Sequence, residues 1–318
     1  MRNGNYCIIP VKMTEHRDPF RAAAALILVL ALTIGPLSGL PAPAQAASTQ
    51  EDAAGPVAAK RTPALKKAAK DFLQDSGRIW SSPFRLKNKH VGPLVLFAAT
   101  TAVLLAADED IHREVKSYAD GHRWVGDVGP VVTTLGGAGA WAAAGLFYGA
   151  GLVLKDPRAR DTGCLAASAI LQSFLVSHAV KGLTGRQRPL TAEGQDHWTG
   201  PAGFFKRYDP DNYGLYDSFP SGHAAVAFSL ATVVALQYRH RLWVGVAAYS
   251  LAAAASLSRV TESRHWMSDV FVGAALGHLV ARLVVRNHTK RQRMVPVVGC
   301  SGRTVVFGFH YALDPVGR

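Results

Sequence analysis

The sequence predicts an all-α protein, a six-helix bundle that crosses a membrane and ends in a short C-terminal β-hairpin. Hydrophobic residues make up 49% of the 318 residues and charged residues 18%, below the roughly 25% usual for soluble domains. The apolar residues are concentrated in runs rich in Ala, Leu and Val. Lys and Arg residues, which produce a net charge of +13, lie in short stretches between these runs. Such alternation is typical of membrane helices joined by short loops.

The same composition excludes several other classes of protein. A chain with this much apolar surface is not disordered, because burial of that surface offsets the entropy lost on ordering. Three Cys residues are too few for a disulfide scaffold or a Cys-based zinc site. A nucleic-acid-binding protein would carry its surplus of Lys and Arg on polar faces with aromatic residues between them. The expected partner is therefore membrane lipid and not nucleic acid.

Residues 1–46 are expected to direct the chain out of the cytoplasm. An uncharged run at residues 22–34 follows Arg17 and Arg21, and the segment ends with the small residues of Ala44-Gln45-Ala46. A basic flank, a short apolar run and a small-x-small exit are the parts of a secretory signal peptide. An uncleaved N-terminal anchor helix is the alternative interpretation.

Residues 47–90 form a polar, basic lead-in to the apolar part of the chain. The stretch from Pro63 to Gln74 has the pattern of an amphipathic helix, which could lie on anionic lipid. Runs of charge more often form solvated faces, and a solvated face is the interpretation that we favour here.

The apolar part, residues 91–286, is expected to supply the six helices of the core. Its apolar runs contain little Pro, as buried or membrane helices require. Several runs are shorter than about 18 residues, so each alone would also suit a helix of a soluble bundle. The runs are Val91–Ala107, Val128–Leu154, Thr162–Val180, Ala224–Tyr238, Leu242–Leu257 and Val270–Ala281.

The charges of the loops indicate which helix ends share a side of the membrane. Asp108–Asp127 carries six acidic and three basic residues, and Pro189–Pro220 carries five acidic and two basic. The other loops are basic, at Lys155–Asp161, at Arg239–Arg241 and after residue 286. Because positively charged short loops are retained in the cytoplasm, the acidic loops are expected outside and the basic loops inside.

This orientation conflicts with the interpretation of residues 1–46 as a signal peptide. A signal peptide leaves residue 47 outside, whereas six crossings with the acidic loops outside require residue 90 to be inside. Either Val91–Ala107 does not fully cross, or the first segment is not a simple signal, or the whole core is an exported soluble domain. The sequence leaves these three alternatives open.

Three groups of polar residues stand at predicted helix ends on the acidic side. One follows the third apolar run, one precedes the fourth, and one lies between the fifth and the sixth. If the runs are helices, all three groups meet on one face of the bundle. They are Lys181-x6-Arg188-Pro189, Pro220-Ser221-Gly222-His223 and Ser258-Arg259-x5-His265-x3-Asp269.

Five of these residues suit the binding of a tetrahedral oxyanion such as phosphate. Lys181, Arg188 and Arg259 supply three cations, and Arg side chains fit phosphate oxygens bidentately. Ser221 and Gly222 open a helix, where free backbone N–H groups and the positive end of the helix dipole attract anions. The Ser221 hydroxyl can donate to an oxygen, and Gly222 has no side chain to block its N–H.

The remaining three side chains suit nucleophilic and acid–base chemistry on that phosphate. His265 and Asp269 are four residues apart, so on a helix they share one face. The carboxylate would hold one imidazole N–H and leave the other ring nitrogen unprotonated toward phosphorus. His223 is then the acid that protonates the leaving oxygen. We predict His265, His223 and Asp269 as the catalytic residues.

Together the three motifs resemble the signatures of the type 2 phosphatidic acid phosphatase / vanadium haloperoxidase superfamily, in its bacterial membrane-associated lipid phosphatase branch. Every signature position is present in order and without substitution, and the resemblance covers roughly residues 91–285. It implies a phosphohistidine intermediate on His265, protonation of the leaving group by His223, and neither a metal nor a cofactor. Residues 1–90 and 287–318 lie outside it.

The resemblance and the apolar core predict a phosphatase of the cell envelope. The expected substrate is a lipid phosphomonoester or diphosphate, and the expected location is the plasma (inner) membrane with the site facing the periplasm or exterior. The alternatives are a soluble exported nonspecific acid phosphatase of the periplasm, a phosphotransferase with the same site, and a non-enzymatic membrane protein that binds anionic headgroups.

Residues 287–318 are expected to form a basic linker and a β-hairpin. Met294–Val298 and Arg303–Ala312 alternate in polarity as strands do, and Gly299–Gly302 lies between them. A two-stranded hairpin alone is only marginally stable, so it needs a surface to pack on. The sequence indicates no function for it.

Overall fold

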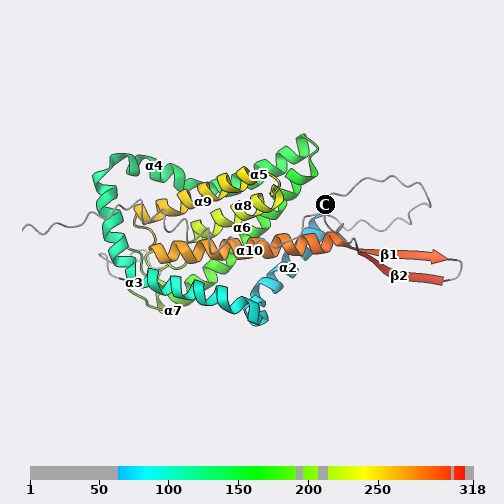
Figure 1. The fold of residues 1–318 in the computed structure, drawn as a ribbon, viewed down its shortest axis with the longest axis horizontal. Coiled ribbons are helices and arrows are strands. Elements are labelled where there is room, and N and C mark those ends of the chain that lie inside the picture. The colour runs from blue at the N-terminus through cyan, green and yellow to red at the C-terminus, as the bar shows by residue number, and fades with distance from the viewer. Residues whose placement is uncertain (1–63, 191–195, 207–213, 302–303, 312–318) are drawn as a thin grey trace, which may run out of the picture.

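The computed structural model describes residues 64–190, 196–206, 214–301 and 304–311, and these residues are mostly helical, as the sequence predicts. Helices α6, α8, α9 and α10 run alongside one another (Figure 1). Residues 1–63, which include the expected signal peptide or anchor, lie outside the described part of the chain. In chain order the helices are α2 (Ala64–Trp80), η2 (Ser82–Arg85), η3 (Asn88–His90), α3 (Val91–Gly121), α4 (Arg123–Thr134), α5 (Ala138–Val153), α6 (Pro157–Thr184), α7 (Pro201–Lys206), α8 (Gly222–Gln237), α9 (Leu242–Thr261) and α10 (Met267–Arg293).

Each apolar run lies in helix, but the second run is divided between α4 and α5, which meet at 45°. The break falls at Leu135-Gly136-Gly137, against the first turn of α8. A Cβ atom on Gly136 would lie 3.2 Å from the backbone oxygen of His223, and one on Gly137 would lie 3.3 Å from Nε2 of the same residue. Glycine at both positions therefore lets the break approach the ring of His223.

The expectation of an acidic loop at Asp108–Asp127 is wrong. Helix α3 continues through this segment to Gly121, and α4 begins at Arg123. The charged residues extend the helix into water, where Lys116 pairs with Asp120 at 2.9 Å, one turn away. Asp108 and His112 of this segment are buried against the bundle, so the loss of apolar character marks neither the end of α3 nor the end of its packing.

Helix α8 lies at the centre of the bundle, with nearly all of Ala224–Val234 buried. Its neighbour α10 approaches it closely through glycine. A Cβ atom on Gly277 would lie 2.1 Å from the backbone oxygen of Ala225, and one on Gly273 would lie 2.4 Å from that of Ser221. This contact holds the beginning of α8 beside the beginning of α10, where the predicted catalytic residues lie.

Among the described residues, four helices are long and apolar enough to cross a membrane: α3 with η3, α6, α9 and α10. The bent pair α4–α5 would add a fifth. Helix α8 has 16 residues, fewer than the roughly 20 that a span needs, and its neighbours enclose it. Apolar side chains of α3, including Leu94, Val95 and Val103, face outward. These helices indicate a membrane protein.

Helix α2 packs on the C-terminal end of α10, which is distant from the predicted catalytic residues. Asp75 of α2 is 1% exposed and accepts hydrogen bonds from Asn287 Nδ2 at 2.9 Å and Arg291 Nη1 at 2.7 Å. Gln172 of α6 donates to the backbone oxygen of Phe72 at 3.1 Å. The lysines of α2, Lys66, Lys67 and Lys70, are exposed, whereas Asp75 of the same helix is buried against α10.

Two strands follow α10 directly. β1 (Met294–Ser301) pairs antiparallel with β2 (Thr304–Tyr311), with Met294 opposite Tyr311. In Figure 1 they extend away from the helices, at the same end of α10 as α2. Residues 287–293, expected as a linker, belong to α10.

Candidate active site

The three sequence motifs meet at one end of the bundle, because neighbouring helices run in opposite directions. Helices α6 and α9 end there, and α8 and α10 begin there. The backbone N–H of Ser221 donates to the backbone oxygen of Asp269 at 2.9 Å, which joins the second motif to the third. A Cβ atom on Gly222 would lie 3.9 Å from Cε of Lys181, so the first motif adjoins the second.

The two cations of the first motif gather around one acidic residue, Asp217. Lys181, in the last turn of α6 and 3% exposed, donates from Nζ to the backbone oxygen of Asp217. Arg188 follows α6 in the chain and binds the Asp217 carboxylate, with Nε at 2.9 Å and Nη2 at 2.7 Å from Oδ1. An internal carboxylate thus lies on a cation that was predicted to bind phosphate.

The charge of Asp217 is retained despite its burial. Burial raises the pKa of this carboxyl, but the charges of Lys181 and Arg188 outweigh burial and hold the pKa below its ordinary value. Asp217 therefore stays ionised at neutral pH. It lowers the positive charge of the site until another anion replaces it on Arg188.

Ser221 and Gly222 form the beginning of α8. Ser221 is the N-cap, and its hydroxyl accepts from the backbone N–H of Ala224 at 3.4 Å. A Cβ atom on Gly222 would be in ordinary van der Waals contact with Cε of Lys181 and Oγ of Ser177, each 3.9 Å away. A helix beginning with free N–H groups in such a position suits an anion.

His223 lies in the first turn of α8 and is half-buried. Its neighbours are the glycine break between α4 and α5 on one side and the three predicted cations on the other. Burial and the charges of Arg259, Lys181 and Arg188 together lower the pKa of His223 to about 4. The ring is therefore neutral at physiological pH while the site holds no anion.

Arg259 completes the set of cations, and Glu262 holds it in position. Its Nη1 donates to Glu262 Oε2 at 2.6 Å, and the other carboxylate oxygen accepts from Thr133 of α4 at 2.5 Å. The Arg259 side chain is 8% exposed, and its Nε has no hydrogen-bond partner among the described residues. The bond to Glu262 therefore leaves part of the guanidinium group for a ligand.

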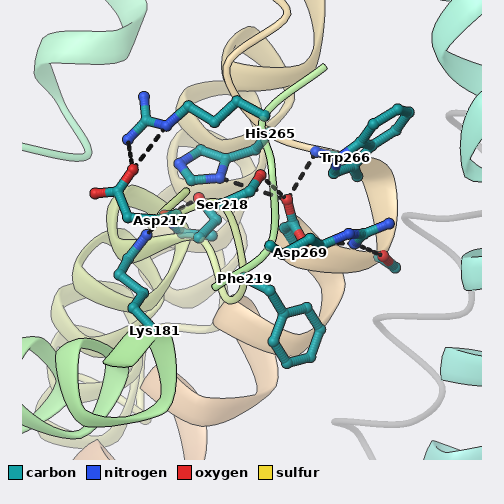
Figure 2. A network of polar contacts seen from close by, with 12 residues as sticks. Lys181, Asp217, Ser218, Phe219, His265, Trp266 and Asp269 are labelled. Atoms are coloured by element: carbon teal, nitrogen blue, oxygen red, sulfur yellow. Dashed lines mark hydrogen bonds and ion pairs between the residues drawn. The ribbon is translucent and has the colours of Figure 1, made fainter. Parts of the chain in front are cut away.

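His265 is almost completely buried, with 2% of its surface exposed, in the short connection between α9 and α10. Figure 2 shows its ring between Asp269 on one side and Asp217 on the other. Nδ1 lies 3.6 Å from Oδ2 of Asp269, slightly beyond hydrogen-bond distance. Burial lowers the pKa of His265 to about 3; Asp269 raises it in part, and Lys181 and Arg188 lower it further. The ring is therefore neutral at physiological pH, as a nitrogen nucleophile must be.

Asp269 is fully buried in the first turn of α10 and accepts from several donors. Its Oδ2 accepts from the Ser218 hydroxyl at 2.5 Å and from the backbone N–H of Trp266 at 2.9 Å, and Oδ1 accepts from Arg186 at 2.6 Å (Figure 2). The position of this carboxylate beside His265 is thus determined on both oxygens.

Three charged residues of this site are not among those predicted from the sequence: Asp217, Glu262 and Arg186. Each lies within five residues of a predicted residue and bonds to a predicted residue. Their closeness in the sequence to predicted residues was the only local feature that could have identified them. Among the described residues, no group of three or more His, Cys, Asp or Glu side chains could hold a metal ion.

The arrangement has the parts needed for phosphoryl transfer. Lys181, Arg188, Arg259 and the beginning of α8 can hold a phosphate, a neutral histidine backed by a carboxylate can attack it, and a second histidine can protonate the leaving group.

Comparison with known proteins agrees with this geometry. Residues 162–293 match the model of the PAP2 superfamily, and all the predicted site residues lie within that range. A stretch of 80 residues is 46% identical to the lipid A 1-phosphatase of Porphyromonas gingivalis, over 25% of this chain. The matched stretch spans 18% of the length of that relative. No solved structure matches the chain.

Proposed function

We propose that this chain, whose residues 162–293 match the PAP2 superfamily model, is a metal-independent phosphatase that hydrolyses a phosphomonoester or diphosphate of a membrane lipid. The observation that carries the proposal is the buried, neutral His265, which lies between the carboxylate of Asp269 and the cations of the site. A protein that only bound anionic headgroups would need the cations but no carboxylate behind a neutral histidine.

In the first step, the substrate phosphate replaces the Asp217 carboxylate on Arg188 and binds Lys181, Arg259 and the free N–H groups at the beginning of α8. The lone pair of His265 Nε2 attacks phosphorus in line with the leaving oxygen, and the bond from phosphorus to that oxygen breaks. His223 takes up a proton as the phosphate anion binds and offsets the neighbouring cations, and the leaving oxygen then takes that proton. Asp269 stabilises the positive charge that develops on His265.

In the second step, water attacks the phosphohistidine. His223, now neutral, removes a proton from the water as its oxygen bonds to phosphorus. The bond between phosphorus and His265 breaks, inorganic phosphate leaves, and both histidines return to their initial state. Asp217 can then bind Arg188 again.

Two observations support a lipid as the substrate. The site lies at the end of helices long and apolar enough to cross a membrane, close to the level of lipid headgroups. The curated relative acts on lipid A, whose phosphates present the same anion to such a site as other lipid phosphates do. We therefore place lipid A phosphate beside phosphatidate, phosphatidylglycerol phosphate and undecaprenyl diphosphate as candidate substrates.

The test is a panel of these lipids with purified protein in detergent micelles, assayed for phosphate release with EDTA present and with added vanadate. We expect one lipid class to be hydrolysed in the presence of EDTA, and we expect vanadate to inhibit that hydrolysis. Equal activity on soluble p-nitrophenyl phosphate without detergent would instead favour a nonspecific acid phosphatase. Transfer of phosphate to an added alcohol in place of water would favour a phosphotransferase. Binding of vanadate without any turnover would contradict the proposal.

We further propose that the catalytic end of the bundle faces the periplasm or exterior. Basic residues gather at the opposite end: Nη1 of Arg158, in the first turn of α6, lies 3.3 Å from Nε2 of His240, in the turn before α9. The basic last turns of α10 lie at the same end. Basic segments are retained in the cytoplasm, so this end is expected inside.

Cysteine labelling tests the orientation in a variant without the native Cys residues. Ser117 and His197 are exposed near the catalytic end, and His240 is exposed at the basic end. A membrane-impermeant thiol reagent should label Ser117→Cys and His197→Cys, but not His240→Cys, in intact spheroplasts. Labelling of all three, together with release of the protein by a salt wash, would indicate a soluble exported enzyme. Labelling of His240→Cys alone would reverse the orientation.

A further inference from the structure

Arg186 is a charged residue near the site whose side chain is 0% exposed. It donates to three carboxylates from different parts of the chain: Asp108 of α3 at 2.7 Å, Asp196 at 2.6 Å and Asp269 at 2.6 Å. Its Nη1 also donates to the Ser268 hydroxyl at 2.7 Å. The chain thus encloses one cation among acceptors of α3, α10 and the segment after α6.

The surroundings of this cation leave it little freedom to move. The guanidinium carbon lies 4.7 Å from the ring centre of Trp198 and 5.2 Å from that of Trp266, as in cation–π contacts. Burial opposes the charge, but Asp269, Asp196 and Asp108 outweigh burial and raise the pKa of Arg186 above its ordinary value. Arg186 therefore remains charged in the folded protein.

Stability alone is a weak reason for such a cluster. Buried ion pairs cost desolvation energy that their attraction only partly offsets, and apolar replacements are often as stable. Here three carboxylates face one guanidinium, so the enclosed charges do not balance. The arrangement is better explained by Asp269, because the second oxygen of that carboxylate faces His265.

Asp269 uses its two oxygens differently. Oδ1 is bound by Arg186 at 2.6 Å, whereas Oδ2 faces Nδ1 of His265 at 3.6 Å. Rotation of the carboxylate about its Cβ–Cγ bond would break the bond to Arg186. The guanidinium on Oδ1, together with the Ser218 and Trp266 donors on Oδ2, therefore determines which oxygen faces the imidazole ring.

We propose that Arg186 is a positioning residue for the nucleophile: by holding Oδ1 of Asp269, it keeps Oδ2 aimed at Nδ1 of His265, so that Nε2 is the unprotonated nitrogen that meets phosphorus. This inference rests on the proposed function. Arg186 itself touches neither phosphate nor the reacting atoms, and acts through Asp269.

The requirement is for arginine and not for any cation. The acceptors on Asp108, Asp196 and Asp269 surround a planar group that donates in five fixed directions. A lysine ammonium is a point charge with three donors and cannot meet all of them. Arg186→Lys should therefore keep the charge of the cluster but lose part of the alignment.

The experiment is a double-mutant cycle on kcat with the lipid that the wild type hydrolyses. Arg186→Gln should lower kcat by about a hundredfold and Arg186→Lys by about tenfold, as misalignment of a catalytic group does. In the Asp269→Asn background, Arg186→Gln should lower kcat by less than about threefold, because the carboxylate that Arg186 positions is already lost. Vanadate affinity should change less than about threefold in every variant, since the three phosphate cations remain.

Asp196→Asn is a milder variant, in case Arg186→Gln does not fold. The Asp196 side chain is 16% exposed and bonds Arg186 at Nε and Nη2, so its replacement loosens the guanidinium without emptying the cluster. We expect a loss in kcat of about threefold to tenfold, again much reduced in the Asp269→Asn background.

Arg291→Gln is the matched control. Arg291 also binds a buried carboxylate, that of Asp75 at 2.7 Å, but at the other end of α10. Its replacement should lower thermal stability and leave kcat unchanged. If the wild type hydrolyses a lipid phosphate but the costs of Arg186→Gln and Asp269→Asn multiply, Arg186 does not act through Asp269 and the inference is wrong. A wild type without turnover on any phosphate would contradict the proposed function itself.

Discussion

Helix α10 carries a buried arginine–carboxylate network at each end, and the two networks differ in what their carboxylates face. At its beginning, Arg186 binds Asp269, and the second oxygen of Asp269 faces His265. Near its end, Arg291 binds both oxygens of Asp75, at 2.7 Å and 3.0 Å. At about 1.5 Å per residue, the 22 residues from Asp269 to Arg291 measure about 33 Å, close to the thickness of the hydrocarbon core.

The comparison shows that burial of an ion pair does not by itself indicate function. Both networks join segments distant in sequence, and both contain a carboxylate that is nearly inaccessible to water. The carboxylate of Asp75 is used entirely by structural donors, Arg291 and Asn287, and connects α2 to α10. The carboxylate of Asp269 keeps one oxygen beside a neutral histidine. Chemistry is expected only where a paired carboxylate also directs one of its oxygens at a side chain that can react.

The largest expected effect is that of His265→Asn at the catalytic end. Turnover should be lost, while vanadate affinity should stay within about tenfold of wild type, because Lys181, Arg188 and Arg259 remain. Rapid-quench trapping of phosphoenzyme with labelled substrate measures the first effect, and vanadate titration by calorimetry measures the second. Phosphoenzyme in the variant at the wild-type level would remove His265 from the role of nucleophile.

Asp269→Asn should have the next largest effect. The asparagine can keep the shape of the site, but it stabilises neither the imidazolium charge nor the tautomer that the attack needs. We expect kcat to fall by about a hundredfold or more at nearly unchanged vanadate affinity. Near-normal turnover would mean that Asp269, like Asp75, has a structural role only.

The protonation of His265 predicts how the activity should depend on pH. Burial lowers the pKa of this ring to about 3, against an ordinary value of 6.5, so the neutral nucleophile persists as the pH falls through 6.5 and is lost only near 3. The profile of kcat/KM, corrected for the phosphate ionisation near pH 6, should therefore show no loss from the nucleophile above about pH 4.

The folded protein should nevertheless lose stability across this pH range. Between about pH 6.5 and 3 the unfolded chain binds a proton at His265 that the folded chain excludes, so acidification favours unfolding. Initial rates after a brief pH jump separate the two effects. A decline of the corrected initial rate centred near pH 6.5 would show that His265 titrates as an ordinary histidine.

The smallest effect on activity is expected from Asp75→Asn at the distant end. Loss of the carboxylate weakens two bonds to Arg291, whose side chain is 21% exposed, so we expect a cost of about 2 kcal/mol in the free energy of unfolding. Thermal denaturation in detergent measures this cost, and kcat measured well below the melting temperature should equal that of wild type. A large fall in kcat would mean that the two ends of α10 are coupled.

The helices were largely predictable from the sequence, since each apolar run lies in helix. The predictions were wrong where the limits of a helix differ from the limits of its apolar run. Helix α3 continues through an acidic segment because Asp108 and His112 there are buried against the bundle, and the run over 128–154 breaks because Gly136 and Gly137 pack on His223. Neither cause is local: the first depends on where the bundle surface lies, and the second on a helix that follows about 85 residues later.

What the sequence determined by itself is the set of residues with chemistry and their phase within each helix. Lys181, Gly222, His223 and Asp269 occupy helix ends because apolar periodicity begins or stops beside them, and spacing of four residues is enough to bring His265 toward Asp269. These relations join residues that are close in the sequence, so they can be predicted without knowledge of the tertiary structure.

Only the tertiary structure decided what surrounds those residues. Arg186 meets Asp269 across 83 positions and Asp108 across 78, and Arg291 meets Asp75 across 216. A charged residue in the sequence carries no mark of its future partner, because an ion pair depends on which surfaces the bundle brings together and on whether water is excluded there. The predicted catalytic groups thus lie in short motifs, whereas their orientation depends on how α3, α6 and α10 assemble.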